Sequence, residues 1–133
     1  MLEITRINHV GIRVSNLQVT RDFYEKLGFE FIMGPVGPEP VAIMEHPSGV
    51  NINFILNANS SSSVNQLMDI SEKHAGYTHI ALEVDDLAKA KGQIEALGCT
   101  ITEGPVETPD GAIFLFIRDP DRNVIEFHQP PSK

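Results

Sequence analysis

Apolar and polar residues alternate along several short stretches of the chain, and the arrangement of these stretches occurs twice. Residues 8–14 and 78–84 carry apolar side chains at every second position, which predicts two strands with one face on a core. Each is followed by apolar residues at helical spacing, and the two predicted helices end at Gly28 and Gly98. Three further strands are expected after each helix: residues 29–33, 41–46 and 51–56, then residues 99–103, 113–118 and 123–128. Each half therefore predicts a strand, a helix and three strands.

Short polar side chains and turn residues separate these elements. Asn16 is the expected N-cap of the first helix, and Asp85 or Asp86 that of the second. Turns rich in Pro and Gly are expected at residues 34–40 and 104–111. The halves are joined by a polar, Ser-rich stretch, residues 57–63, which reads as a flexible linker. Residues 64–73, which follow it, are able to form a short helix.

The two halves also match residue by residue, at an offset of 70 positions. Asn8-His9-Val10 returns as Thr78-His79-Ile80, and after three added residues Asn53 matches Glu126. Such a repeat predicts two copies of one supersecondary unit that bury their faces together. We therefore expect a single domain over residues 1–133, with module one at about 4–56, a connector at 57–76 and module two at 77–128.

Composition and charge narrow the class of protein. The chain is 41% hydrophobic and 21% charged, which is typical of a soluble globular protein. It shows neither a membrane-spanning run nor a secretory signal, and its one cysteine, Cys99, fits a reducing compartment, so a cytoplasmic location is expected. A net charge of −8 with scattered Lys and Arg argues against nucleic acid as a partner.

Strand alternation places the candidate chemistry on one face. On residues 78–84 the apolar side chains face the helix, so His79 and Glu83 face the other way. The same alternation puts Glu126 on that opposite face, and in the first half it does so for His9 and Asn53. These side chains are expected to meet if the faces are concave and oppose one another.

Two imidazoles and a carboxylate on a shared face are a ligand set for a divalent metal with open positions. Such ligands suit Fe, Mn, Ni, Co or Zn, and three protein ligands leave room for water and substrate. His9, His79 and Glu126 are therefore the predicted metal ligands. The three other histidines are interpreted as packing or surface residues: His46, His74 and His128.

These residues resemble the motifs of the vicinal oxygen chelate superfamily, also called the glyoxalase/bleomycin resistance/extradiol dioxygenase family. The resemblance covers about residues 4–128 and rests on four motifs: Asn8-His9-Val10, Phe23-Tyr24-x-x-Leu27-Gly28-Phe29, Thr78-His79-Ile80-Ala81-Leu82-Glu83-Val84-Asp85-Asp86 and Asp119-Pro120-Asp121-x-Asn123-x-Ile125-Glu126. It implies an α+β fold of two tandem βαβββ modules whose curved sheets form a half-open barrel around a metal. It also implies that His9, His79 and Glu126 hold that metal.

The resemblance implies a metal-dependent enzyme that acts on a small molecule with adjacent oxygens, and a homodimer with sites completed within one chain or across two. Three functions stay open: a lyase or isomerase like lactoylglutathione lyase, an oxygenase like the Fe(II) extradiol dioxygenases, and a non-enzymatic drug-binding protein like the bleomycin resistance proteins. Asn53 stands where glyoxalase I members usually have Glu or Gln, so it is a possible fourth ligand or substrate contact. Arg13 and Glu83 are expected to line the cavity, and no catalytic residue is assigned.

Overall fold

The computed structural model describes residues 1–59 and 64–132, which form two compact units. The first unit is Met1–Ser61 and the second is Ser62–Lys133. Part of the predicted linker, residues 60–63, lies outside the described residues.

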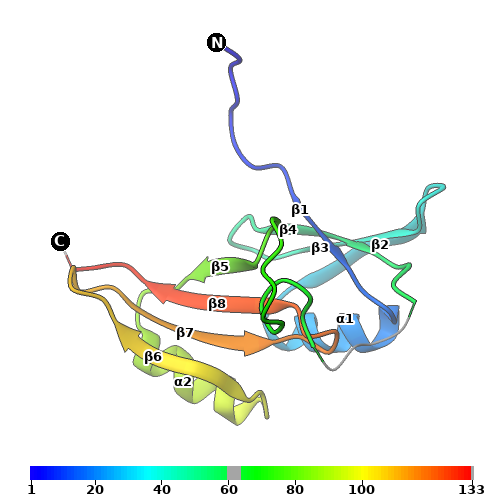
Figure 1. Cartoon of the computed structure of the whole chain (residues 1–133). Helices are drawn as coiled ribbons and strands as arrows, with labels where there is room; N and C mark the ends of the chain where they lie inside the picture. Colours follow the sequence, from blue (N-terminus) through cyan, green and yellow to red (C-terminus); the bar gives the residue numbers. More distant parts are fainter. Residues whose placement is uncertain (60–63, 133) are drawn as a thin grey trace. The chain divides into compact units, whose positions relative to one another are not determined.

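The first unit is one helix and one four-stranded sheet. Its elements follow the predicted order: β1 (Val10–Arg13), α1 (Leu17–Lys26), β2 (Glu30–Val36), β3 (Val41–Glu45) and β4 (Asn51–Ile55). The strand order in the sheet is β1-β4-β3-β2, in which β1 is parallel to β4 and the other pairs are antiparallel. The helix lies against one face of this sheet (Figure 1).

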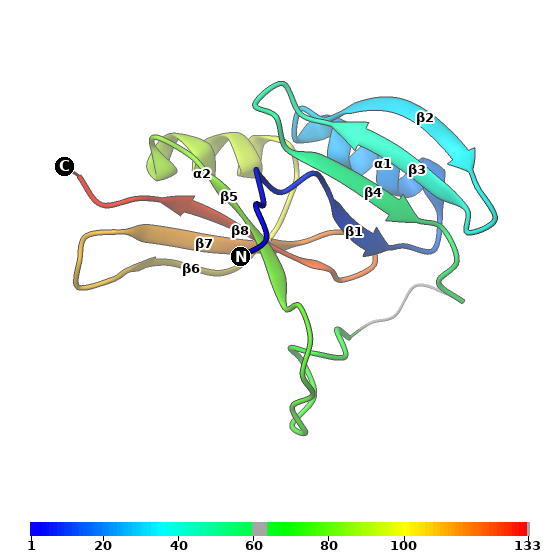
Figure 2. The same ribbon diagram turned by 90° about the horizontal axis from the view of Figure 1, so that it is seen from above.

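The second unit repeats this plan. Its elements are β5 (His79–Glu83), α2 (Leu87–Ala96), β6 (Ile101–Glu107), β7 (Ile113–Arg118) and β8 (Val124–Gln129). The strand order is β5-β8-β7-β6, again with one parallel pair, β5 with β8. Figure 2 shows α2 beside β5 and β8 of its own sheet. The predicted α+β fold with two βαβββ modules is confirmed; each sheet is open, and neither closes into a barrel by itself.

The strand alternation seen in the sequence places the core on the helix side of each sheet. In the first unit the buried side chains come from α1 and alternate strand positions: Val14, Tyr24, Ala42, Met44, Ile52 and Phe54. In the second they come from α2, β7 and β8: Leu87, Ile94, Leu115, Ile117, Ile125 and Phe127. Since neighbours along a strand point to opposite faces, the polar residues between these positions are held on the other face.

Both helices begin where the capping residues predict. The side chain of Asn16 accepts a hydrogen bond from Val19 N at 3.0 Å, and that of Asp86 accepts one from Lys89 N at 3.1 Å. Asp86 is therefore the cap of α2, and Asp85 precedes it. Neither helix of the described chain has the length and apolar character needed to cross a membrane.

Two segments differ from the sequence prediction. β2 and β6 continue to Val36 and Glu107, through positions expected to be turns. The glycines there, Gly34 and Gly104, have φ of 130° and 86°, and their strand pairings shift register around them. A Cβ at Gly34 would lie 2.5 Å from Ala42 Cα, which is too close for any side chain. β2 therefore approaches β3 this closely only because residue 34 is glycine.

The segment expected to be able to form a short helix, residues 64–73, consists of turns and bends. One helical turn is present, because Asp69 N donates to Asn65 O at 2.9 Å. The side chain of Asn65 accepts from Leu67 N and Met68 N, which satisfies donors at the start of this turn. Apolar residues at helical spacing occur at Val64, Leu67 and Met68, which is too short a run to extend the turn into a helix.

The turns between β3 and β4 and between β7 and β8 are equivalent. His46 N donates to Val50 O at 2.8 Å in the first, and Asp119 N donates to Asn123 O at 2.9 Å in the second. At the same place in both turns the backbone is left-handed, with φ of 100° at Gly49 and 69° at Arg122. The repeat thus extends to backbone conformation, with a glycine in one copy and an arginine in the other.

Candidate metal centre

β8 carries one carboxylate among apolar neighbours. Glu126 is only 9% exposed, and its pairing partners across the sheet are Ala81 on β5 and Phe116 on β7. A carboxylate that is nearly out of water needs hydrogen-bonding or charged partners, because leaving it unpaired is costly. Glu126 has such partners on both of its oxygens.

The two partners are histidines of the same unit. His79 Nε2 lies 3.1 Å from Glu126 Oε1, and His128 Nδ1 lies 2.7 Å from Glu126 Oε2. The imidazoles are about one-third exposed, and they come from β5 and from β8 itself. The structure therefore gathers a carboxylate and two imidazoles on the face of this sheet away from α2.

The residue before each predicted histidine ligand orients its ring. His79 Nδ1 lies 2.9 Å from Thr78 Oγ1, and His9 Nδ1 lies 2.8 Å from Asn8 Oδ1. An Nδ1–H donated to these oxygens leaves the lone pair on Nε2, which is the form that binds a metal. The arrangement is equivalent in the two units, and in this tautomer Nε2 of both rings is the nitrogen left without a proton.

The pair formed by His79 and Glu126 has a spacing that suits a metal. Nitrogen and oxygen ligands lie about 2.0–2.2 Å from a bound Zn²⁺, so two adjacent ligands are roughly 3 Å apart. The observed 3.1 Å between Nε2 and Oε1 fits this spacing as well as it fits a hydrogen bond. Within residues 1–59 and 64–132, no group of three or more His, Cys, Asp or Glu side chains is arranged to hold a metal ion. The second unit supplies two of the predicted ligands, and the third, His9, belongs to the first unit.

Asn53 occupies the position in the first unit that Glu126 occupies in the second. It pairs with Gly11 on β1 and with Ile43 on β3, as Glu126 pairs with Ala81 and Phe116. Its amide oxygen is able to bind a metal, whereas the amide lacks the charge and the basicity of a carboxylate.

The two other predicted cavity residues have different surroundings. Arg13 Nε donates to Asn57 Oδ1 at 2.8 Å, and its terminal nitrogen lies 3.6 Å from Glu39 Oε1. Its positive charge is thus already partly balanced within the first unit. Glu83 is exposed at the end of β5 and pairs in register with His128.

His128, which the sequence analysis interprets as a packing or surface residue, has a polar contact beyond packing, because its ring lies against Glu126. Its ring also stacks on Phe114, with the planes 4° apart and the centroids 6.3 Å apart. The available signal was strand alternation: two residues after Glu126, His128 shares its face. Phe116 on the same face has its ring 5.5 Å from that of His79, so aromatic rings support both imidazoles.

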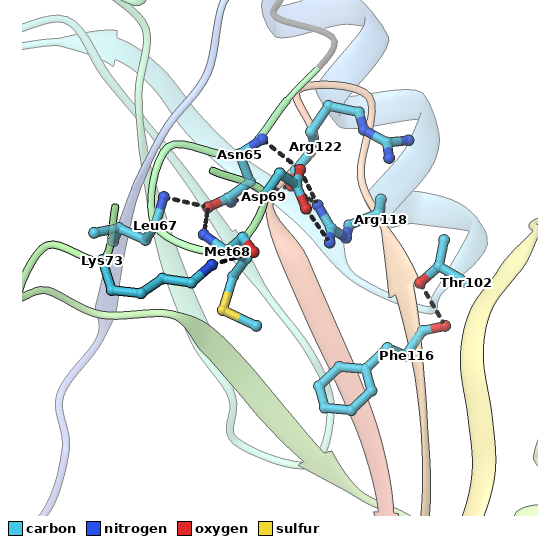
Figure 3. A network of polar contacts seen from close by, with 9 residues as sticks. All are labelled: Asn65, Leu67, Met68, Asp69, Lys73, Thr102, Phe116, Arg118 and Arg122. Carbon is cyan, nitrogen blue, oxygen red and sulfur yellow. Dashed lines mark hydrogen bonds and ion pairs between the residues drawn. The ribbon is translucent and has the colours of Figure 1, made fainter. Parts of the chain in front are cut away.

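The connector binds the end of this sheet through an ion pair (Figure 3). Arg118 donates from both terminal nitrogens to the two oxygens of Asp69, each at 2.9 Å. This hydrogen bonding, with a backbone hydrogen bond from Asn65, lowers the pKa of Asp69 from 3.8 to about 2. Asn65 also donates to the backbone oxygen of Arg122 at 3.2 Å. Arg118 is thereby held by the connector, at the end of the sheet where His79 begins β5.

Comparison with known proteins gives the same family for most of the chain. The family model of the Glyoxalase/Bleomycin resistance protein/Dioxygenase superfamily matches residues 6–127. A lactoylglutathione lyase of Escherichia coli O157:H7 is 32% identical over 127 residues, which cover 91% of this chain and 90% of that protein. A lactoylglutathione lyase of Neisseria meningitidis serogroup A is 29% identical over 136 residues, with 96% and 92% covered.

Solved structures share the fold along nearly the whole chain. A glyoxalase family protein from Enterococcus faecalis superposes with a TM-score of 0.74 at 25% identity, covering 93% of this chain and 97% of that one. TnmS3, an antibiotic binding protein from Streptomyces sp. CB03234, gives 0.74 at 20% identity, covering 98% and 99%. Together with the paired βαβββ modules, these matches show that the chain belongs to the glyoxalase/bleomycin resistance/dioxygenase superfamily.

Proposed function

We propose that this chain is a metal-dependent lyase or isomerase that acts on a small molecule with two neighbouring oxygens. The observation that carries the proposal is the His79–Glu126 pair, with 3.1 Å between Nε2 and Oε1. If Thr78 Oγ1 accepts a hydrogen bond from Nδ1–H, the lone pair of His79 lies on Nε2, the nitrogen next to Glu126. This imidazole and this nearly buried carboxylate would supply two of the three proposed ligands.

His9 is the third proposed ligand, and the ring nitrogen it would offer is Nε2, because Asn8 holds Nδ1. The metal would be Fe, Mn, Ni, Co or Zn, all of which accept imidazole and carboxylate ligands. When bound, such an ion supplies a Lewis acid that stabilises negative charge developing on adjacent substrate oxygens. We propose that the protein is a homodimer, and that His9 joins the other two ligands within one chain or from the partner subunit.

The lyase or isomerase reaction is supported by the relatives named lactoylglutathione lyase, which match along about nine-tenths of their length. Asn53 limits how this chain would perform it, because an amide does not accept a proton as a carboxylate does. A proton acceptor must then come from elsewhere, and Glu83 is a carboxylate on the same face as His79. Asn53 would serve instead as a fourth ligand or as a contact for the substrate.

A second candidate is an oxygenase like the Fe(II) extradiol dioxygenases. The observation in its favour is again Asn53, because a site with two histidines, one glutamate and no further carboxylate matches the facial set of non-haem iron oxygenases. The two candidates differ in the metal they need. The oxygenase requires Fe(II) and consumes oxygen, whereas the lyase or isomerase needs the ion only as a Lewis acid, without a change of oxidation state, and consumes none.

The test is the metal content of protein purified without chelator, measured by elemental mass spectrometry. We expect about one Fe, Mn, Ni, Co or Zn per chain in the wild type and a large loss in His79→Ala. His74→Ala is the matched control, since it removes a surface imidazole that is 58% exposed. Equal metal content in all three proteins, or none even after reconstitution, would contradict the proposal.

The metal-loaded protein then distinguishes the two reactions. Turnover in a lactoylglutathione lyase assay without oxygen uptake would favour the lyase. Oxygen uptake with a catechol, only in the Fe(II) form, would favour the oxygenase. A metal-bound protein that shows neither activity and binds drug-like ligands would favour the non-enzymatic alternative.

A further inference from the structure

The two oxygens of Glu126 are in different environments. Oε1 faces His79 Nε2 at 3.1 Å, and Oε2 faces His128 Nδ1 at the shorter distance of 2.7 Å. One oxygen thus lies beside a predicted metal ligand, and the other is held by a residue outside the predicted ligand set.

His128 is itself held in place by its neighbours. Its ring lies parallel to the Phe114 ring, and the two residues are paired across β7 and β8. On its other side, β5 contributes Glu83 as the paired residue. The parallel Phe114 ring and the contact of Nδ1 with Oε2 together orient the imidazole.

We propose that His128 is a positioning residue, which holds Glu126 so that only Oε1 is offered to the metal. The inference rests on the proposed function, since it concerns how the metal ligand is presented. A His128 N–H donated to Oε2 occupies that oxygen and fixes the carboxylate plane. A glutamate that uses one oxygen takes one coordination position instead of two, which leaves more positions for a substrate with two oxygens.

The repeat supports this role. The first unit has Ile55 at the position equivalent to His128, two residues after Asn53. The βαβββ unit therefore forms without an imidazole at this position. A histidine occurs in the copy that has a carboxylate to orient, and an apolar residue in the copy that has none.

Binding of Co²⁺ to the purified, metal-free protein tests the inference, followed by calorimetry and by the visible absorption of the bound ion. His128→Leu removes the donor, and we expect Co²⁺ affinity to fall about tenfold to a hundredfold, the usual effect of losing a partner of a metal ligand. The visible bands should also change, because Glu126 is then able to bind through both oxygens. His128→Asn retains an N–H donor near the place of Nδ1, so it should recover most of the affinity and the wild-type spectrum.

Two further variants separate this role from a loss of folding. Phe114→Leu keeps the imidazole but removes the ring that it stacks on, and we expect a smaller loss of Co²⁺ affinity than in His128→Leu. His74→Asn removes an imidazole at the surface and should leave Co²⁺ binding unchanged. Urea unfolding of each variant establishes that the protein remains folded.

Two results would overturn the inference and leave the proposed function standing. One is wild-type affinity and spectrum in His128→Leu. The other is a loss of Co²⁺ in both His128 variants as complete as in His79→Ala, which would make His128 a metal ligand itself. A wild-type protein that binds no Co²⁺ would instead contradict the proposed function, and the inference with it.

Discussion

The equivalent turns before β4 and β8 each contain one residue with a left-handed backbone, a glycine in the first and an arginine in the second. Exchanging glycine and a larger residue at these two positions should therefore change the free energy of unfolding in opposite directions. We predict that Gly49→Ala destabilises the protein and that Arg122→Gly stabilises it. Both positions have a left-handed backbone, with φ of 100° and 69°. The hydrogen bonds that close the two turns are the same, so the turns differ chiefly in their side chains.

The magnitude follows from the backbone and the surrounding space. An L-residue in the left-handed region costs roughly 1–2 kcal/mol, while Ala restricts the unfolded chain and recovers about 0.4–1 kcal/mol. A Cβ at Gly49 meets no atom within 4 Å, so no clash adds to this. The free energy of unfolding of Gly49→Ala should therefore fall by about 1 kcal/mol.

In Arg122→Gly both backbone contributions to the free energy of unfolding change sign. It relieves roughly 1–2 kcal/mol of backbone cost and loses about 0.5–1 kcal/mol to the greater freedom of the unfolded chain. It also removes Arg122 Nε, which is buried without a hydrogen-bond partner. The backbone oxygen that accepts from Asn65 stays in place. We expect a net gain of about 0.5–1 kcal/mol.

Urea unfolding followed by circular dichroism measures both changes. At a slope of about 2 kcal/mol per molar urea, a change of about 1 kcal/mol shifts the midpoint by about 0.5 M. Gly92→Ala is the control: this exposed glycine lies inside α2 with no atom near its Cβ position, so alanine there should stabilise. Shifts of the same sign in Gly49→Ala and Arg122→Gly would refute the reasoning.

Three further predictions follow from contacts described above. Glu126→Gln removes the ligand charge and should lower the metal content of the purified protein about tenfold or more, measured by elemental mass spectrometry; unchanged content would remove Glu126 from the ligand set. Because folding lowers the pKa of Asp69 from 3.8 to about 2, the Asp69–Arg118 pair should stabilise fully above pH 3.8 and lose its effect as the pH falls through about 2. The difference in urea midpoint between wild type and Asp69→Asn should therefore be largest at pH 7 and much smaller near pH 2, and a constant difference would argue against the ion pair. Asn16→Ala and Asp86→Ala should each cost about 1 kcal/mol of unfolding free energy, since each removes an N-cap; no change in thermal or urea unfolding would contradict this.

Local patterns in the sequence were sufficient for the fold. Alternation and helical spacing are set by the geometry of single elements, so they predicted the order of strands and helices in both units. The caps Asn16 and Asp86 were visible for the same reason, because a cap acts on the next turn of its own helix. The ends of β2 and β6 were missed, since glycine and proline were taken as turn signals where they allow a bulge within a strand.

Only those parts of the site that follow from strand alternation could be predicted from the sequence. Strand alternation placed Glu126 and His79 on one face, and in the structure His79 Nε2 lies 3.1 Å from Glu126 Oε1. The role of His9 as third ligand stays a prediction. The binding of Arg118 by Asp69 joins residues 49 positions apart, and no pattern in the sequence indicates such a pair. The stacking of His128 on Phe114 agrees with its interpretation as a packing residue, whereas its contact with Glu126 went unnoticed although strand alternation puts both side chains on one face.

Asn53 and Glu126 occupy equivalent positions in the two sheets, and this has a consequence for protein engineering. In the first unit Asn53 lies beside Gly11 in the same pairing that sets Glu126 beside Ala81, and His9 is oriented by Asn8 as His79 is by Thr78. The sheet that lacks the carboxylate already has the histidine and the residue that contacts its Nδ1, although Ile55 stands in place of His128. Asn53→Glu would therefore place a histidine and a glutamate at equivalent positions in both units, and with Ile55→His added a chain with one such set would become a scaffold with two.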